Sequence, residues 1–148
     1  MRGYFEIGVL HPKTATNLGT LWRSAYQLGA AGIFVIGARF SRQASDTLKT
    51  WRHVPLREYR DLDDFLSHRP YACPLIGIEM GGKDLAAWHH PDRCTYLLGA
   101  EDHGLTPGAM AACQSVVSIP AERTSSFNVA VAGSIVMWHR MISGGIND

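Results

Sequence analysis

Short apolar runs recur along this chain, and each ends at a glycine, a proline or a polar turn. A strand of a parallel sheet has this composition because helices cover it on both faces. Such strands are predicted at 4–10, 32–37, 74–79, 94–99 and 115–120, with a shorter one at 53–56. Segments between them have the apolar spacing of helices. This alternation predicts an α/β fold with a mostly parallel sheet flanked by helices.

The helices are predicted from periodicity and from their end signals. The segment 17–30 has apolar residues at helical spacing and Gly29 as its stop. The segment 61–69 begins with acids, which the positive end of a helix dipole favours. Further helices are predicted at 106–114 and from 128 to about 141, and a brief one at 46–51. The segment 80–93 is predicted to be a loop.

The size of the chain favours one domain over residues 1–148, because two halves would each bury a weak core. No apolar run approaches the about 20 residues of a membrane span. The N-terminal residues lack the small-residue cleavage site of a signal peptide. We therefore expect a cytoplasmic protein.

The cysteines and histidines do not predict a metal site. Cys73, Cys94 and Cys113 are far apart and have no close Cys or His partner, so they are interpreted as reduced packing residues. The pair His89 and His90 has no third ligand at metal spacing. It is interpreted as a pair of loop histidines, and no metal cofactor is expected.

Charge is distributed unevenly between the two parts of the chain. Residues 1–60 contain nine Lys or Arg and three acids, a net charge of +6, whereas residues 61–148 have five and ten, a net charge of −5. This asymmetry indicates a phosphate-binding face, or else chance variation on a solvated surface. Trp51 either packs or stacks on an unpaired base. The candidate RNA-binding residues are Lys13, Arg39, Arg42, Lys49, Arg52 and His53.

Polar, glycine-marked turns follow three of the predicted strands, at 79–82, 99–104 and 119–128. Ligands of open α/β sheets bind where the carboxyl ends of strands meet, so these turns are predicted to converge on one ligand. Glycines there let backbone amides approach it closely. The GxGxxG and GxxxxGK[ST] fingerprints are absent from the sequence, which argues against NAD and ATP.

Three ordered motifs follow predicted strands, and the second and third of them contain two of these turns. They are N-L-G-T-L-W-R (Asn17, Gly19, Arg23), L-L-G-A-E-D-H-G-L (Gly99, Glu101, Gly104, Leu105) and I-P…S-S-F-N-V-A-V-A (Ile119, Pro120, Ser126, Asn128, Ala132). In this order, the motifs resemble those of the SpoU/TrmH branch of the SPOUT RNA methyltransferases. The resemblance implies a deep trefoil knot in the C-terminal part, S-adenosyl-L-methionine bound within it, and a homodimer.

The activity implied by the resemblance is methyl transfer to a ribose 2′-hydroxyl of RNA, with tRNA favoured over rRNA. Neither DNA nor a membrane is an expected partner. The implied catalytic set is Arg23, Asn17, Glu101, Ser126 and Asn128. Phe127 would form a wall of the adenine slot, at a place where Leu or Met is commoner. The implied cofactor contacts are Ile78, Glu79, Met80, Leu98, Gly99, Gly104, Ile119 and Phe127.

The roles within the catalytic set have alternatives. Arg23 is a tuned base or a cation that binds the target phosphate, and we favour the second because a guanidinium with a pKa above about 12 is a poor base. Asn17 either caps the first helix or also orients Arg23 or the ribose. Glu101 is a solvated loop acid or the partner of Arg23, from the same or the neighbouring subunit. Ser126 is a cap hydroxyl or a ribose contact.

Two other functions stay open. A knotted methyltransferase acting on a base nitrogen would need an acidic base, for which Asp102 is the candidate. A catalytically silent RNA-binding protein of the same fold is the other alternative. The joint presence of the five residues of the catalytic set argues against silence.

Overall fold

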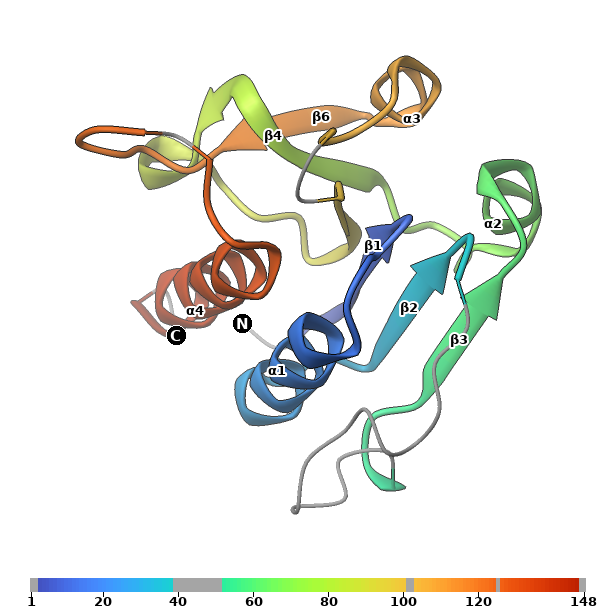
Figure 1. The fold of residues 1–148 in the computed structure, drawn as a ribbon. Helices are drawn as coiled ribbons and strands as arrows, with labels where there is room; N and C mark the ends of the chain where they lie inside the picture. Colours follow the sequence, from blue (N-terminus) through green and yellow to red (C-terminus); the bar gives the residue numbers. More distant parts are fainter. Residues whose placement is uncertain (1–2, 39–51, 101–102, 125, 147–148) are drawn as a thin grey trace.

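The computed structural model describes residues 3–38, 52–100, 103–124 and 126–146 (Figure 1). Within them, parallel strands form a six-stranded sheet in the order β3-β2-β1-β5-β4-β6. The mostly parallel sheet predicted from the apolar runs is confirmed. The strands are β1 (Tyr4–Leu10), β2 (Gly32–Ile36), β3 (Leu56–Tyr59), β4 (Leu75–Asp84), β5 (Arg93–Leu98) and β6 (Ser115–Ser118).

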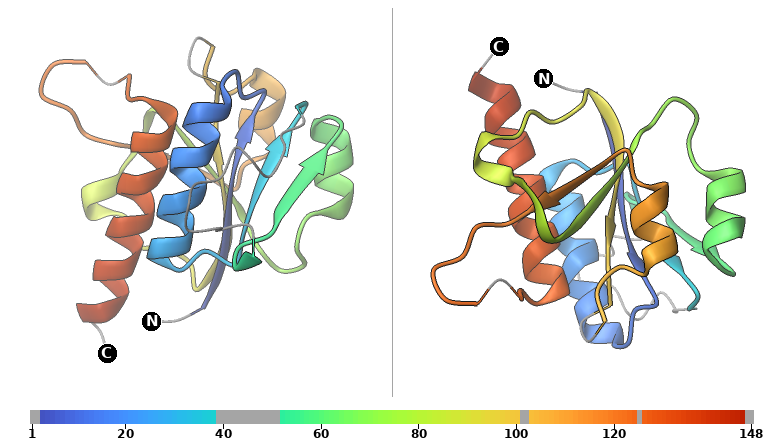
Figure 2. Two further views of the ribbon diagram at one scale, coloured as in Figure 1. Left: turned by 60° about the horizontal axis from the view of Figure 1, so that its bottom comes forward. Right: turned by 90° about the horizontal axis from the view of Figure 1, so that it is seen from above.

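Helices cover both faces of this sheet. Helices α1 (Ala15–Leu28) and α4 (Val129–Ile146) lie side by side on one face, and α2 (Leu62–His68) and α3 (Pro107–Ala112) cover the other (Figure 2). A short 3₁₀ turn, η3 (Leu85–Ala87), follows β4. The flanking helices expected from the sequence are therefore present.

Alternate residues of the central strands belong to two separate core clusters, one on each face. On β2, Ile33 and Val35 pack in the cluster that contains the α1 and α4 side chains. Phe34 and Ile36 pack on the opposite face with Phe65 of α2. Burial on both faces explains why these strands are continuously apolar.

The boundaries of α1 and β3 differ from those predicted. Helix α1 begins at Ala15, two residues early, because the Thr14 hydroxyl accepts a hydrogen bond from the Asn17 amide at 3.3 Å and caps the helix. It ends at Gly29, as predicted, with a left-handed φ of 92°. Strand β3 begins at Leu56 instead of residue 53; the Val54 carbonyl accepts a hydrogen bond from the Trp22 indole at 2.8 Å.

Other differences lie in the second part of the chain. Strand β4 continues to Asp84, into the segment predicted to be a loop, and α4 continues to Ile146. The predicted helix at 46–51 lies outside the described residues. No helix among the described residues is long and apolar enough to cross a membrane.

Small residues at the start of α4 allow close contact with α1. A Cβ atom added to Gly133 would lie 2.4 Å from Leu21 Cδ1, so the two helices come this close because residue 133 has no side chain. Ser134 Oγ also forms a hydrogen bond of 2.7 Å with Ser24 Oγ of α1. Val131 differs from its neighbours because its side chain is 46% exposed.

The far end of α4 is fixed to the segment before β5. The buried Arg140 guanidinium donates to the carbonyls of Pro91 (2.7 Å) and Asp92 (2.8 Å). His90 contacts the Tyr96 hydroxyl at 2.6 Å through Nδ1 and His139 Nδ1 at 2.8 Å through Nε2. His90 therefore belongs to a packed hydrogen-bond network.

No group of three potential metal-ligating side chains occurs among the described residues. Cys73 and Cys94 are buried, Cys113 is half-buried, and all three are unpaired thiols. Burial raises the pKa of Cys94 and Cys113 and so favours the uncharged thiol in both.

The His90 network predicts a pH-dependent loss of stability. Burial, followed by the charges of His139 and Arg140, lowers the pKa of His90 from 6.5 to about 3. The unfolded chain therefore takes up this proton first, and stability falls as the pH drops below 6.5. The contribution is about 2 kcal/mol between pH 7 and pH 5. Chemical denaturation at pH 7 and at pH 5 should show a smaller difference in the free energy of unfolding for His90→Gln than for the wild type. The neighbouring variant His89→Gln, at an exposed position, should keep the wild-type difference; an unchanged difference in His90→Gln would contradict the assignment.

Candidate active site

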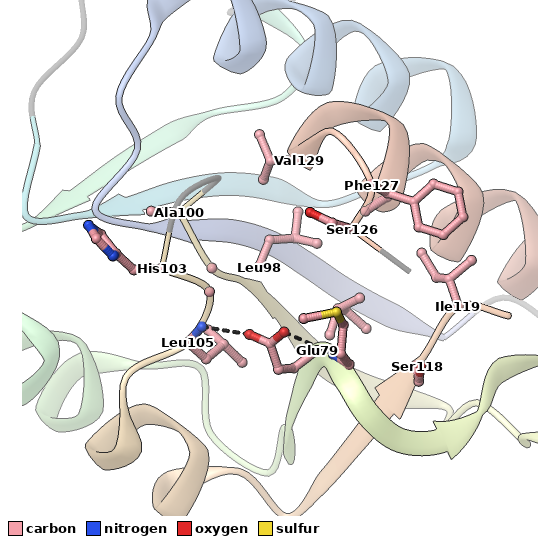
Figure 3. Close-up of a pocket in the computed structure, with 15 residues that line it drawn as sticks. Glu79, Leu98, Ala100, His103, Leu105, Ser118, Ile119, Ser126, Phe127 and Val129 are labelled. Atoms are coloured by element: carbon pink, nitrogen blue, oxygen red, sulfur yellow. Dashed lines mark hydrogen bonds between the residues drawn. The ribbon is translucent and has the colours of Figure 1, made fainter. Parts of the chain in front are cut away.

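A cavity of about 460 Å³ opens at the carboxyl ends of β4, β5 and β6 (Figure 3). The eight residues predicted to contact the cofactor all line it, so the structure brings the three glycine-marked turns together. Their role in binding a cofactor stays a prediction. The lining residues are Ile78, Glu79, Met80, Leu98, Gly99, Ala100, His103, Gly104, Leu105, Ser118, Ile119, Ser126, Phe127, Val129 and Ala132.

One wall of the cavity is an irregularity in β4. Ile78 and Lys83 both align with Val117 of β6, so residues 79–82 leave the ladder as a bulge. Gly81 has a left-handed φ of 83°, and a Cβ atom on Gly82 would lie 2.5 Å from the Val116 carbonyl oxygen. This detour in β4 thus depends on its two glycines.

Glu79 connects this bulge to the turn after β5. Its Oε2 atom accepts a hydrogen bond from the Leu105 amide at 2.7 Å, and Oε1 accepts one from the Met80 amide at 2.8 Å (Figure 3). The carboxylate thus binds protein amides and shapes the cavity. A cofactor in contact with Glu79, as predicted, would meet the side of the carboxylate that does not bind the Leu105 and Met80 amides.

The turn after β5 is compact because two glycines face each other. A Cβ atom on Gly99 would lie 2.2 Å from the carbonyl carbon of Gly104, and one on Gly104 would lie 2.2 Å from Glu79 Oε2. Gly104 also has a left-handed φ of 64° and donates its amide hydrogen to the Ala100 carbonyl at 2.8 Å. Space therefore requires both glycines, and conformation requires Gly104 as well.

Two of the predicted catalytic residues are in direct contact. Asn128 Nδ2 donates to Asn17 Oδ1 at 3.0 Å. Asn128 Oδ1 accepts from the amides of Ala130 (2.9 Å) and Val131 (3.2 Å), so Asn128 caps α4. Asn17 is not a cap, because Thr14 has that place and Asn17 lies in the first turn of α1. This asparagine pair joins the first turns of two helices.

The remaining catalytic candidates are placed differently. Ser126 lines the cavity, whereas Arg23 lies exposed on α1 and is not among the lining residues. Glu101, and Asp102 of the alternative function, lie outside the described residues. Of the predicted set, the described residues therefore bring together the asparagine pair and place Ser126 at the cavity.

The predicted RNA-binding residues are separated along the sheet. Lys13 is exposed just after β1, at the carboxyl ends of the strands. Arg52 and His53 are exposed just before β3, at the opposite end, where His53 stacks on Tyr26 with ring centroids 5.0 Å apart. Arg39, Arg42, Lys49 and Trp51 lie outside the described residues.

Several lining residues were missed by the sequence analysis. Ser118 ends β6 beside Ile119, and its position at a strand end was a usable signal. Val129 and Ala132 are one helical turn apart on α4, so they face the cavity together. His103 lies within the second motif, at a position to which no role was assigned.

A pair of glycine variants tests the geometry of the second turn. Gly104→Ala places a Cβ atom against Glu79 in a strained conformation, so it should lower the free energy of unfolding by more than about 1 kcal/mol. Gly108→Ala is the control, because its added Cβ atom meets only Leu62 Cδ2, at 3.8 Å. In helix α3 this change should be neutral or stabilising by up to about 1 kcal/mol. Equal effects in urea denaturation would contradict the close contact.

Comparisons with known proteins identify the relatives of this chain. Residues 5–138 match the model of the SpoU rRNA Methylase family. The tRNA (guanosine(18)-2′-O)-methyltransferase TARBP1 of Mus musculus is 30% identical over 135 residues, which are 83% of this chain and 8% of TARBP1. This chain thus spans a small part of that relative.

Solved structures have the same fold. The SpoU methyltransferase AviRb from Streptomyces viridochromogenes, in complex with the cofactor AdoMet, has a TM-score of 0.82 and 22% identity over 97% of this chain and 59% of AviRb. A protein studied for 2-OH methylation of C/U34 on tRNA has a TM-score of 0.83 and 22% identity, over 97% of this chain and 92% of its own. At these identities the likeness shows the fold.

Proposed function

Because the chain belongs to the SpoU rRNA Methylase family, we propose that it transfers the methyl group of S-adenosyl-L-methionine to a ribose 2′-hydroxyl of RNA. The observation that carries this proposal is the cavity where the turns of the second and third motifs meet the 79–82 turn. Its volume of about 460 Å³ lies within the usual range for small-molecule sites. We favour tRNA as the substrate, because the names of TARBP1 and of the C/U34 enzyme both specify tRNA.

The lining residues fit this cofactor chemically. Leu98, Ile119 and Phe127 offer apolar surfaces to an adenine ring, and the glycines leave backbone groups of the turns accessible. The carboxylate of Glu79 on the wall favours a cationic ligand, and the cofactor carries a sulfonium. When bound, the cofactor supplies a methyl group already activated for transfer.

The protein then has to place the ribose oxygen in line with the methyl group and let its proton leave. In the proposed site Arg23 binds the target phosphate as a cation, since its guanidinium stays charged at neutral pH. The asparagine pair keeps the starts of α1 and α4 in place. Ser126, at the cavity, contacts the ribose, and Glu101 orients Arg23.

Cofactor binding and product analysis test this function. Calorimetry should show S-adenosyl-L-methionine binding to the full chain. Nucleoside mass spectrometry of RNA from a strain lacking the gene should show one 2′-O-methylnucleoside after incubation with protein and cofactor. Arg23→Lys should lower turnover at least about tenfold, because an ammonium replaces a bidentate guanidinium, with cofactor affinity unchanged. Arg60→Lys, at another exposed arginine, is the control and should keep the wild-type turnover.

Three outcomes separate the alternatives. Absence of cofactor binding at millimolar concentration would leave a silent RNA-binding protein. A base-methylated product would favour the base-nitrogen enzyme. Near-full turnover of Arg23→Lys would exclude a bidentate role for Arg23.

We also propose that the C-terminal part forms the deep knot implied by the resemblance. In its support, α4 lies between α1 and the 85–92 segment that joins β4 to β5, with contacts from Gly133 to Leu21 and from Arg140 to Pro91. Strand β6 lies outside β4 in the sheet, so the chain returns across the molecule to reach α4. An experimental structure with α4 outside the loop made by β4, 85–92 and β5 would contradict it.

A homodimer through α1 and α4 is proposed as the assembled form. Val131, Trp138 and Met141 of α4 are 46%, 51% and 49% exposed, and their spacing puts them on one side of the helix. Tyr26 of the adjacent α1 is 39% exposed. A large apolar face across two neighbouring helices suits a second copy of the chain, because a two-fold interface pairs the same patch on both subunits.

Sedimentation measurements test this interface. The wild-type chain should have the mass of a dimer, and Trp138→Glu should sediment as a folded monomer, because a carboxylate would be buried at the centre of an apolar contact. Tyr71→Glu is the control, since Tyr71 is 93% exposed but belongs to neither helix. A dimeric Trp138→Glu variant would rule out this face.

A further inference from the structure

A second cavity, of about 470 Å³, lies at the end of the sheet opposite to the candidate active site. Its walls are the 69–74 loop, which leads into β4, and Gln114, which immediately precedes β6. Because all strands are parallel, this cavity is at their amino ends, whereas the motif turns are at their carboxyl ends. It therefore shares no wall with the first site.

Arg69 lines this cavity. Its Nη1 atom is itself buried and has no hydrogen-bond partner among the described residues. A buried donor without a partner costs free energy, since folding removes its water without replacing it. A guanidinium on a cavity wall is suited to a phosphate, which the Nε and Nη2 atoms can bind through two parallel hydrogen bonds.

An aromatic ring stands beside this guanidinium in sequence and on the same cavity. Tyr71 is 93% exposed, the highest value among the large hydrophobic residues described. The next residue, Ala72, has a left-handed φ of 60°, which is strained for a residue with a Cβ atom. The loop thus presents a planar ring to solvent at a cavity that Arg69 also lines.

Further cations lie at the amino ends of the strands. Arg52 precedes β3, Arg57 is the second residue of β3, and Arg93 is the first residue of β5, and all three are exposed. The Arg57 guanidinium is partly neutralised by Glu6 at 3.2 Å. Exposed acids at this end are Glu58 and Asp92. Of these residues, Arg93 is on β5, next to β4, whereas Arg52 and Arg57 belong to the β3 edge of the sheet.

We propose that the 69–74 loop and Gln114 form a second RNA-contact site, in which Arg69 binds a backbone phosphate and Tyr71 stacks on an adjacent unpaired base. Guanidinium with phosphate and an aromatic ring with a base are the two contacts by which proteins hold single-stranded RNA. The site rests on the proposed function for its substrate class. A strand of seven residues spans roughly 23 Å, so an RNA of tRNA size reaches both ends of the sheet.

Fluorescence anisotropy with a short labelled oligouridylate tests the site on the full chain. Arg69→Gln should weaken binding about tenfold and reduce the slope of log affinity against log salt by about 0.7, as expected for one lost phosphate contact on a single strand. Tyr71→Ala should weaken binding about fivefold or more. Arg60→Gln removes one positive charge just before α2, away from the cavity wall, and should change affinity less than about twofold.

A stability measurement distinguishes binding from folding. Arg69→Met should keep or raise the melting temperature, because it removes a buried donor that has no partner, while it weakens RNA binding as Arg69→Gln does. A lowered melting temperature in Arg69→Met would indicate a structural residue and overturn the proposal.

Three other results would also overturn it. The first is wild-type affinity for the oligonucleotide in both Arg69→Gln and Tyr71→Ala. The second is a wild-type chain that does not bind the oligonucleotide. The third is a wild-type chain that inorganic phosphate stabilises through Arg69 while RNA does not bind. None of these results affects the proposed methyl transfer, because that activity is read from cofactor calorimetry and from the methylated nucleoside.

Discussion

Hydrogen bonds that the Glu79 carboxylate accepts hold the edge of the candidate active site together. The bond from the Leu105 amide joins the bulge of β4 to the turn after β5, and the bond from the Met80 amide lies within the bulge. This contact forms only because Gly99 and Gly104 leave room for each other and for the carboxylate. The cavity walls are therefore backbone segments at fixed separation, and the glycines of the second motif serve steric fit as much as ligand approach.

The other side of the site depends on how α1 and α4 meet. Their first turns are linked by Asn17 and Asn128, and Gly133 permits close packing further along. The Arg140 contacts then fix the last turns of α4 to the segment before β5. A helix held at both ends has little freedom to tilt, so Val129 and Ala132 keep their place on the cavity wall.

The sequence predicted the sheet well, because strands covered on both faces are apolar without interruption, as β2 is. It also predicted that the three glycine-marked turns converge, since carboxyl ends of parallel strands meet at one edge, and the eight candidate cofactor residues do line one cavity. It offered Asn17 as a cap of α1, whereas Thr14 has that place, because both side chains cap helices and the apolar spacing does not fix the first residue. The start of β3 and the partner of Glu79 depend on contacts over 32 and 26 residues, which local patterns do not contain. The unpaired Arg69 donor likewise required coordinates.

The titratable groups at the cavity indicate what kind of catalyst this chain is. Among the described lining residues, only Glu79 and His103 have titratable side chains, and both carboxylate oxygens of Glu79 already accept backbone hydrogen bonds. A methyl group on a sulfonium needs little further activation. The larger requirement is to hold a ribose oxygen in line with it. Alignment of this kind lowers the activation barrier by about 7 kcal/mol or more in favourable cases. Under the proposed function, RNA contacts far from the cavity would therefore contribute to the rate, because they would fix the position of the nucleotide that reacts.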